Sequence, residues 1–102
     1  DATHFPAAGV TVSIHYVGRI QTAEKGLSEP FDSSRARGRP LLAKLGADQL
    51  IRAMEDVLPH MSVGQVVQVV APPHYAYGRA GWPPIIPPNA TLVFELELVS
   101  FM

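Results

Sequence analysis

The side chains of this sequence that could support chemistry are aromatic and apolar rather than nucleophilic or metal-binding. There is no cysteine, and none of the four histidines has another histidine four residues away, the spacing of a helical zinc pair. Neither a Gly-x-Ser-x-Gly turn nor a glycine-rich phosphate loop occurs. Glu95 and Glu97 lie two residues apart, and a solvent-facing strand explains them better than paired acid–base catalysis. These exclusions favour binding in an apolar pocket, or a reaction that needs no nucleophile, metal or cofactor.

The residues that would line such a pocket are concentrated between Ala71 and Phe94, where six of the ten prolines fall. Because proline has no backbone N–H, this segment cannot be a helix interior or a central strand. It is also too apolar for a solvated linker, since it carries Tyr75, Tyr77, Trp82, Ile85 and Ile86. A stiff aromatic loop suits a pocket wall whose shape is fixed before a ligand arrives. The alternative is a long connection that its aromatic side chains pin to the core, and composition alone favours neither.

A second candidate is Asp32, which follows Phe31 and precedes Arg35, Arg37 and Arg39. Arginines in such a loop are usually solvated, and exposed ion pairs contribute little to stability. If Phe31 is anchored inward, however, Asp32 would be partly desolvated. It would then need a positively charged or hydrogen-bonding partner.

Length and composition indicate one small globular domain over residues 1–102, with 47% hydrophobic residues and a formal net charge of −1. This charge argues against nucleic acid as a main partner. No apolar run approaches the ~20 residues of a membrane span, and no signal peptide is visible. The absence of cysteine fits a cytoplasmic protein. The chain begins with Asp1 rather than methionine, which is compatible with a segment cut from a longer protein.

Period-two alternation predicts the strands that must position these residues. Strands are expected over 10–17, 41–45, 66–71 and 91–101, the first of them able to continue through Gln21. Residues 1–9 are expected to form an irregular lead-in and residues 22–30 a surface loop. His15 would lie on the polar face of its strand, as a surface residue.

One helix is expected over residues 46–58. Its apolar stripe would consist of Leu50, Ile51, Met54, Val57 and Leu58. Asp48 would lie in the first turn, Pro59 would end the helix, and Glu55 and Asp56 would face solvent. Several strands, one short helix and no βαβ alternation predict an α+β fold with an antiparallel sheet packed against the helix.

Six motifs then occur in a fixed order from about Val10 onward. They are His15-Tyr16-x-Gly18, Phe31-Asp32-Ser33-Ser34-Arg35, Leu45-Gly46, Met61-Ser62-Val63-Gly64-Gln65, Tyr75-Ala76-Tyr77-Gly78 and the run from Ile85 to Phe94. Together they resemble the FKBP (FK506-binding protein) domain, the family of tacrolimus-binding prolyl isomerases. The resemblance implies a curved antiparallel sheet, a half-barrel, wrapped around one short helix, with the ligand pocket between them.

The resemblance also implies a function: peptidyl-prolyl cis–trans isomerisation, with X-Pro segments of client proteins and tacrolimus or rapamycin as ligands and no cofactor. The implied catalytic residues are Tyr16, Asp32, Tyr77 and Phe94. The implied ligand-binding residues are Tyr16, Phe31, Asp32, Arg37, Leu41, Gln49, Leu50, Ile51, Met54, Tyr77, Trp82, Ile85, Ile86 and Phe94. By resemblance, the Ile51 N–H and the Tyr77 hydroxyl donate to ligand carbonyls. Arg37 would face Asp32, and Tyr16 would donate to the same carboxylate.

The sequence departs from the family pattern at three pocket positions. Met54 stands where the typical catalytic member has a tryptophan, Leu41 replaces an aromatic residue, and Trp82 replaces a smaller polar ring. The loop over residues 21–30 is longer than usual, and no first strand is visible upstream of Val10. Members that lack the tryptophan are often weak isomerases within Hsp90 co-chaperones. The alternative function is therefore a weakly catalytic or non-catalytic binding module of a larger Hsp90-type co-chaperone. A carbohydrate- or lipid-binding domain is a third class, which the density of motifs disfavours.

Overall fold

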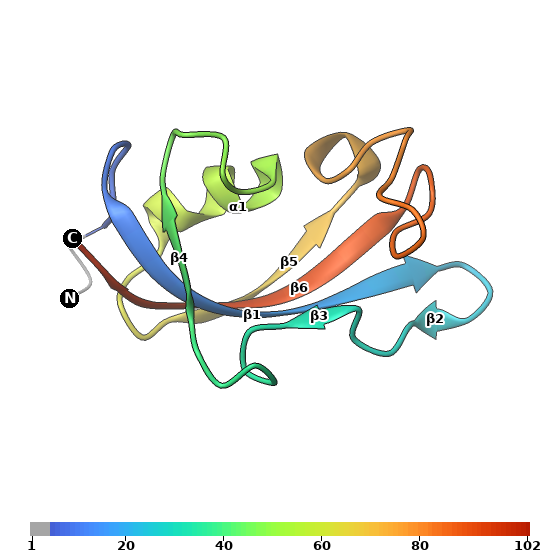
Figure 1. Ribbon diagram of the computed structural model, residues 1–102, viewed down its shortest axis with the longest axis horizontal. Coiled ribbons are helices and arrows are strands. Elements are labelled where there is room, and N and C mark those ends of the chain that lie inside the picture. Colours follow the sequence, from blue (N-terminus) through green and yellow to red (C-terminus); the bar gives the residue numbers. More distant parts are fainter. Residues whose placement is uncertain (1–4) are drawn as a thin grey trace.

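The structure is a computed structural model that describes residues 5–102, and its main element is a curved antiparallel sheet. The strands are β1 (Thr11–Thr22), β2 (Gly26–Leu27), β3 (Asp32–Ser33), β4 (Leu41–Lys44), β5 (Val66–Ala71) and β6 (Thr91–Phe101). The sheet order is β2-β1-β6-β5, and β3 and β4 also pair with β1. Figure 1 shows the long strands β1 and β6 curving beneath the single α-helix, α1 (Arg52–Val57). The predicted α+β half-barrel with one short helix is confirmed.

The β1–β6 pair forms the centre of the sheet, and its alternation places one face of each strand in the core. Tyr16 lies opposite Leu96 and Gly18 lies opposite Phe94. Of the inward side chains, Ile14 and Leu96 are fully buried, as the period-two pattern predicts. The predicted strands at 66–71 and 91–101 are observed with those bounds, and β1 continues past Gln21 to Thr22.

The helix is shorter than the sequence pattern predicts, because it begins at Arg52 rather than at residue 46. Gly46 and Asp48 have φ values of +82° and +58°, which lie in the left-handed region and cannot belong to a right-handed helix. Asp48 therefore lies in a turn and not in the first helical turn. At the other end, Pro59 belongs to a 3₁₀ turn, Leu58–His60, that continues from the α-helix. Proline is tolerated there because the first N–H of such a turn has no partner in it.

Two segments predicted as irregular are partly ordered by pairing with β1. Within the predicted loop over 22–30, β2 folds back on the end of β1, with Gln21 opposite Leu27. The short strand β3 pairs Asp32 with Gly18 and was not predicted. In the lead-in, Pro6 is fully buried and the Gly9 N–H donates to the Leu45 carbonyl at 2.9 Å, but no strand forms over residues 5–10. Residues 1–4 of the predicted lead-in lie outside the described part of the chain.

One hydrophobic core fills the space between the sheet and the helix. Its fully buried members come from several elements and are Val12, Ile14, Leu58, Met61, Leu92, Leu96 and Leu98. Met54, on α1, is 4% exposed and lies among them. The core holds α1 over the concave face of the sheet. The space beside Met54 is a cavity between the helix and the sheet.

Candidate ligand-binding site

A cavity of about 190 Å³ lies between α1 and the concave face of the sheet. Its lining residues come from six separate parts of the chain and are Tyr16, Phe31, Asp32, Leu41, Gln49, Leu50, Ile51, Met54, Tyr77 and Phe94. All of them belong to the predicted site, so the fold brings together residues up to 78 positions apart in sequence (94 − 16). The lining is mainly aromatic and aliphatic, and its ionisable groups are one carboxylate, Asp32, and two phenols, Tyr16 and Tyr77.

Three aromatic rings make one wall of the cavity: Tyr16 on β1, Phe94 on β6, and Phe31 just before β3. Phe94 contacts Tyr16 and Phe31 edge to face, with ring centroids 6.3 and 5.9 Å apart. Such edge-to-face pairs are the favoured aromatic geometry. The rings can lie against β1 because Gly18 has no side chain. A Cβ there would stand 2.7 Å from Phe31 Cζ and 2.8 Å from Phe94 Cε1.

Asp32 follows the inward-facing ring of Phe31, and its carboxylate has both a hydrogen-bonding and a positively charged partner. The Tyr16 hydroxyl donates to Oδ2 at 2.7 Å, and the Arg37 guanidinium donates to Oδ1. Arg37 also donates to the Tyr16 hydroxyl oxygen at 2.9 Å. The three groups form a closed network in which the hydroxyl of Tyr16 both donates and accepts. This network fixes the Tyr16 ring at the cavity wall.

Burial and this network shift the pKa values of the two tyrosines that line the cavity. The pKa of Tyr16 is raised above 10.0, first by burial and then by its hydrogen bond to Asp32. The pKa of Tyr77 is also raised, by burial and by the negative charge of Asp32. The hydrogen bonds to Tyr16 and Asp32 raise the pKa of Arg37. Both phenols therefore keep their protons, and can donate hydrogen bonds, throughout the neutral range.

These raised pKa values predict that stability falls as the pH rises above about 10. In that range the unfolded chain loses phenolic protons before the folded chain does, so the folded state binds more protons and becomes less favoured with increasing pH. Urea unfolding of the wild type, Tyr16→Phe and Tyr77→Phe between pH 8 and pH 11 measures this. Each variant should lose less stability across the range than the wild type. Parallel declines in all three proteins would contradict the assignment.

The segment between β4 and α1, which carries Gln49, Leu50 and Ile51 to the cavity, is held by two side-chain acceptors. The Lys44 N–H donates to Gln49 Oε1 at 2.9 Å, and the Gly46 N–H donates to Glu55 Oε1 at 3.0 Å. The prediction that Glu55 faces solvent is therefore wrong, and its Oε2 is buried without a partner among residues 5–102.

The Ile51 N–H donates to no other group among residues 5–102, whereas the Ile51 carbonyl accepts hydrogen bonds from the N–H groups of Met54 and Glu55. A free backbone donor thus lies at the cavity.

The prediction that His15 is a surface residue is also wrong. His15 is half-buried, and its Nδ1 lies 2.9 Å from the hydroxyl of Ser34, which is fully buried. The Ser34 hydroxyl also accepts the Tyr16 N–H at 2.8 Å. Ser34 therefore fixes the backbone of β1 directly beneath Tyr16. Glu97 is partly exposed and pairs with the half-exposed Arg35, which is compatible with its predicted position on the solvent face of the strand.

The proline-rich loop between β5 and β6 forms a wall beyond this cavity. Trp82 and Ile86 pair as an isolated bridge, with the Trp82 N–H donating to the Ile86 carbonyl at 2.8 Å. Gly81 permits this closure, because its φ is +64° and an added Cβ would lie 2.5 Å from the carbonyl oxygens of Ile86 and Pro87. The loop is therefore an ordered structure with a defined turn, as its proline content predicts.

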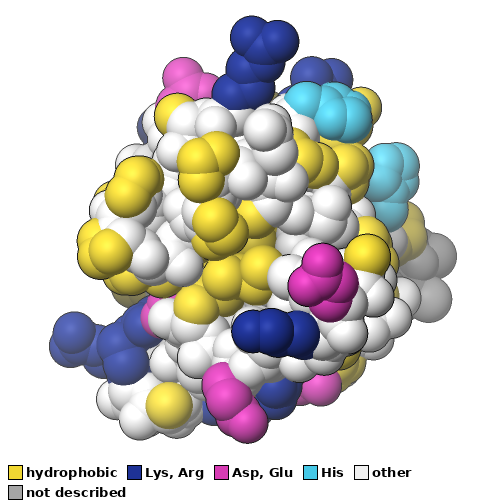
Figure 2. Space-filling model, turned by 90° about the vertical axis from the view of Figure 1, so that its right-hand side faces the viewer, with side chains coloured by type: hydrophobic (Ala, Val, Ile, Leu, Met, Phe, Trp, Pro, Cys, Tyr) yellow, Lys and Arg dark blue, Asp and Glu magenta, His cyan; other side chains and the backbone are white. Residues whose placement is uncertain are grey.

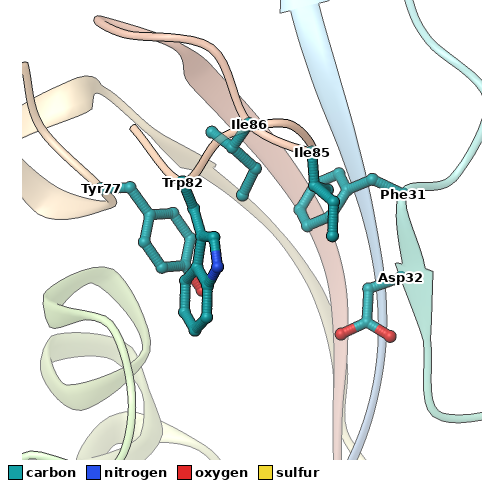
Figure 3. A pocket seen from close by; sticks show the side chains of 6 residues that line it. All are labelled: Phe31, Asp32, Tyr77, Trp82, Ile85 and Ile86. Carbon is teal, nitrogen blue, oxygen red and sulfur yellow. The ribbon is translucent and has the colours of Figure 1, made fainter. Parts of the chain in front are cut away.

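This loop encloses a second cavity of about 300 Å³ with Phe31, Asp32, Tyr77, Trp82, Ile85 and Ile86 as its lining (Figure 3). Trp82 and Ile85 are 60% and 55% exposed. Figure 2 shows hydrophobic side chains gathered across the middle of this end of the molecule, with charged side chains around them. Every predicted site residue except Arg37 lines one of the two cavities, and Arg37 reaches them through Asp32.

Three other residues near the site were not predicted from the sequence. Asp48, Arg52 and Ala76 line a third hollow, of about 390 Å³, together with Gln49, Leu50, Ile51, Tyr77 and Trp82. Arg52 stacks over the Tyr75 ring, with 4.6 Å between its Cζ and the ring centroid. A charged residue at the start of a helix does not by itself predict such a hollow. The hollow forms only when the proline-rich loop is folded against the helix.

No three His, Asp or Glu side chains within residues 5–102 come together as a possible metal-binding group. In the same part of the chain, no helix has the length and apolar character needed to cross a membrane.

Comparison with known proteins identifies the family of this chain. The family model described as FKBP-type peptidyl-prolyl cis-trans isomerase matches residues 2–99. The chain is 43% identical over 100 residues to FK506-binding protein 1 of Kluyveromyces lactis, covering 98% of this chain and 83% of that protein. It is 44% identical over 99 residues to peptidyl-prolyl cis-trans isomerase FKBP1A of Xenopus laevis, covering 97% and 87%. The chain therefore belongs to the FKBP-type peptidyl-prolyl cis-trans isomerase family.

Proposed function

We propose that this chain catalyses cis–trans isomerisation of X-Pro peptide bonds, with the proline ring held in the 190 Å³ cavity. The observation that carries this proposal is the combination of an apolar, aromatic cavity with two free donors at its edge. Within residues 5–102, the Tyr77 hydroxyl and the Ile51 N–H donate to no other group. Two donors beside an apolar cavity suit a ligand that presents an apolar ring and adjacent carbonyl oxygens, as a prolyl peptide does.

The physical basis of such catalysis is differential binding of the twisted amide. A prolyl amide isomerises in roughly tens of seconds unaided, because rotation removes the resonance of its C–N bond. The twisted amide has less charge separation than the planar amide, so it loses less by leaving water. A cavity formed by Tyr16, Met54 and Phe94 therefore favours the twisted form over the planar form. Donors at Tyr77 and Ile51 would hold the carbonyls on either side while the bond rotates. No covalent intermediate is needed.

The proposed residues have distinct roles. Phe94, Tyr16 and Met54 contact the proline ring, and Tyr77 donates to a peptide carbonyl. Asp32 faces the amide and is itself held by Tyr16 and Arg37. Leu41, Gln49 and Leu50 complete the rim. Because FK506 binding is named for several relatives, we propose that tacrolimus (FK506) and rapamycin bind in the same cavity of this chain.

Exchange spectroscopy on a short Leu-Pro peptide tests the catalytic proposal. The cis and trans proline signals should exchange faster as this protein is added, with a rate proportional to protein concentration. The fold should be monitored in the same sample through the protein's own methyl signals. Unchanged exchange at a protein concentration similar to that of the peptide, with the fold intact, would contradict catalysis. Peptide binding without acceleration would instead favour the second candidate, a non-catalytic binding module of an Hsp90-type co-chaperone.

Met54 favours this second candidate, because its thioether side chain stands at the cavity floor where the typical catalytic member has the flat ring of a tryptophan. We expect Met54→Trp to strengthen FK506 binding by about tenfold, since a fixed indole supplies more contact area than a flexible chain. Calorimetric titration measures the affinity. Met61→Leu is the matched control, because Met61 lies in the core away from the cavity and should leave the affinity unchanged. Equal or weaker binding by a folded Met54→Trp protein would show that the floor does not limit affinity.

A further inference from the structure

Glu55 holds both ends of the turn that carries the Ile51 N–H to the cavity. This turn, over residues 46–51, connects β4 to α1 (Figure 1). At its start, the Gly46 N–H donates to Glu55 Oε1 at 3.0 Å. At its end, the Glu55 N–H donates to the Ile51 carbonyl at 3.1 Å. A single residue of α1 therefore links the beginning of the turn to its end.

The backbone of this turn needs such support. Gly46 and Asp48 have φ values of +82° and +58°, both in the left-handed region. For Asp48, which has a Cβ, this conformation costs free energy and persists only where the surrounding structure holds it. The Glu55 carboxyl group supplies a contact of this kind, because it accepts a hydrogen bond from the turn while its own backbone belongs to the helix that follows.

The other oxygen of the same carboxyl group has no use in the interactions described so far. Glu55 Oε2 is buried and has no partner within residues 5–102. A buried acceptor without a donor lowers the stability of the folded state, so it calls for an explanation other than stability. Glu55 does not belong to the residues that line the 190 Å³ cavity. Any effect of Glu55 on a ligand must therefore pass through the turn that it holds.

We propose that Glu55 is a positioning residue, which fixes the 46–51 turn so that the Ile51 N–H is a preorganised donor for a ligand carbonyl. Ile51 has an extended backbone, with φ of −63° and ψ of 155°, directly before the first residue of α1. A donor that is held in place before the ligand arrives loses little freedom on binding. This inference rests on the proposed function, because the ligand carbonyl is that of a prolyl peptide.

Three substitutions of Glu55 separate its hydrogen bond from its charge. Glu55→Gln keeps an acceptor oxygen at the same reach, so it should bind a Leu-Pro peptide within about twofold of the wild type. Glu55→Met keeps the length of the side chain but has no comparable acceptor, and Glu55→Asp keeps the charge but is one methylene shorter. Both should weaken binding by about threefold to tenfold, as expected when a hydrogen-bond donor is misplaced. Calorimetric titration measures the affinities.

Asp56→Asn is the matched control, since it removes a carboxylate charge from the same helix at the next position. The Asp56 side chain is 56% exposed and pairs with Arg52 at 3.7 Å. An exposed pair four residues apart on a helix contributes little to stability. The variant should therefore leave the peptide affinity unchanged.

Amide hydrogen exchange measures the positioning of the turn separately from overall stability. The Gly46 N–H should exchange at least about tenfold faster in Glu55→Met and Glu55→Asp than in the wild type, and at the wild-type rate in Glu55→Gln. The Leu45 N–H donates to the Val10 carbonyl at 2.9 Å and is the internal reference, which should stay protected in every variant. When peptide is added, the Ile51 amide resonance should shift strongly in the wild type and Glu55→Gln, and less in the other two variants.

The outcomes distinguish failure of this inference from failure of the proposed function. If the wild type binds and isomerises the peptide but Glu55→Met and Glu55→Asp bind it as tightly, the positioning role is overturned and the catalytic proposal stands. If Glu55→Gln loses as much affinity as Glu55→Asp, the hydrogen bond is not the cause and the inference is again overturned. Glu55→Asp decides the question if Glu55→Met does not fold. If the wild type binds no prolyl peptide, the proposed function fails and this inference fails with it.

Discussion

Replacing Phe94 with alanine is expected to lower the free energy of unfolding by about 3–5 kcal/mol. Phe94 is 3% exposed and contacts the rings of Tyr16 and Phe31. The truncation removes a buried ring and leaves a void that extends the existing cavity. The neighbouring side chains cannot fill this void by small movements, so most of the lost contacts are not replaced. A small domain has a total stability of about 5–15 kcal/mol, so this loss is a large fraction of the whole. Urea unfolding measures it.

Phe5→Ala is the matched control for this prediction, since it makes the same chemical change at a position that is 44% exposed. It should change the stability by at most about 0.5 kcal/mol, as surface substitutions usually do. Phe94→Leu then separates folding from function, because it keeps most of the buried volume but loses the flat ring. It should remain folded and bind prolyl peptides more weakly. A Phe94→Ala protein as stable as the wild type would show that Phe94 is not part of the core that shapes the cavity.

Gly18→Ala is expected to destabilise the protein by about 1–3 kcal/mol and to weaken ligand binding by about tenfold or more. In an ordinary strand, replacing glycine with alanine stabilises by about 0.5–1 kcal/mol. The sign reverses here because the new methyl group would lie 2.7 Å from Phe31 Cζ and 2.8 Å from Phe94 Cε1. Both rings must move, and both line the cavity. Urea unfolding and peptide titration measure the two effects.

A second substitution checks the cause of the Gly18 effect. Phe31→Leu removes the ring atom nearest to the added methyl group, so the double variant Gly18→Ala, Phe31→Leu should be more stable than the sum of the single changes predicts. Gln21→Ala, at an exposed position of the same strand, should have little effect. Strict additivity of Gly18→Ala and Phe31→Leu would show that the clash with Phe31 is not the source of the instability.

The strands could be predicted from sequence because alternation alone determines which face is buried. β5 and β6 have the predicted bounds, and the inward residues of β1, such as Ile14, are buried as expected. The helix start could not be predicted in this way. Leu50 and Ile51 match a helical stripe with Met54, yet they reach the core side from a turn with left-handed residues at Gly46 and Asp48. An apolar stripe indicates which side chains face inward, but it does not determine whether their backbone is helical or forms a turn.

Polar contacts between distant segments were the other features that sequence patterns missed. Glu55 appeared to be on the solvent face of a helix, but it accepts the Gly46 N–H because the preceding turn folds over it. His15 alternates with buried residues, but the buried hydroxyl of Ser34 lies against it. The hollow that Trp82 and Arg52 line also depends on a tertiary contact, since it forms only when the proline-rich loop packs beside α1. Composition alone pointed to Asp32 and to the proline-rich loop with Tyr77 and Trp82, and motif resemblance supplied the rest of the candidate site.

The most direct measurement of the central claim is an intermolecular NOE experiment on a bound Leu-Pro peptide with methyl-labelled methionine. The three methionines act as position markers, because Met54 lines the cavity, Met61 is 1% exposed in the core and Met102 is 93% exposed at the end of the chain. If the cavity holds the proline ring, its protons should show contacts to the Met54 methyl group and none to those of Met61 or Met102. Contacts to Met102, or binding with no contact to Met54, would contradict the claim that this cavity holds the proline.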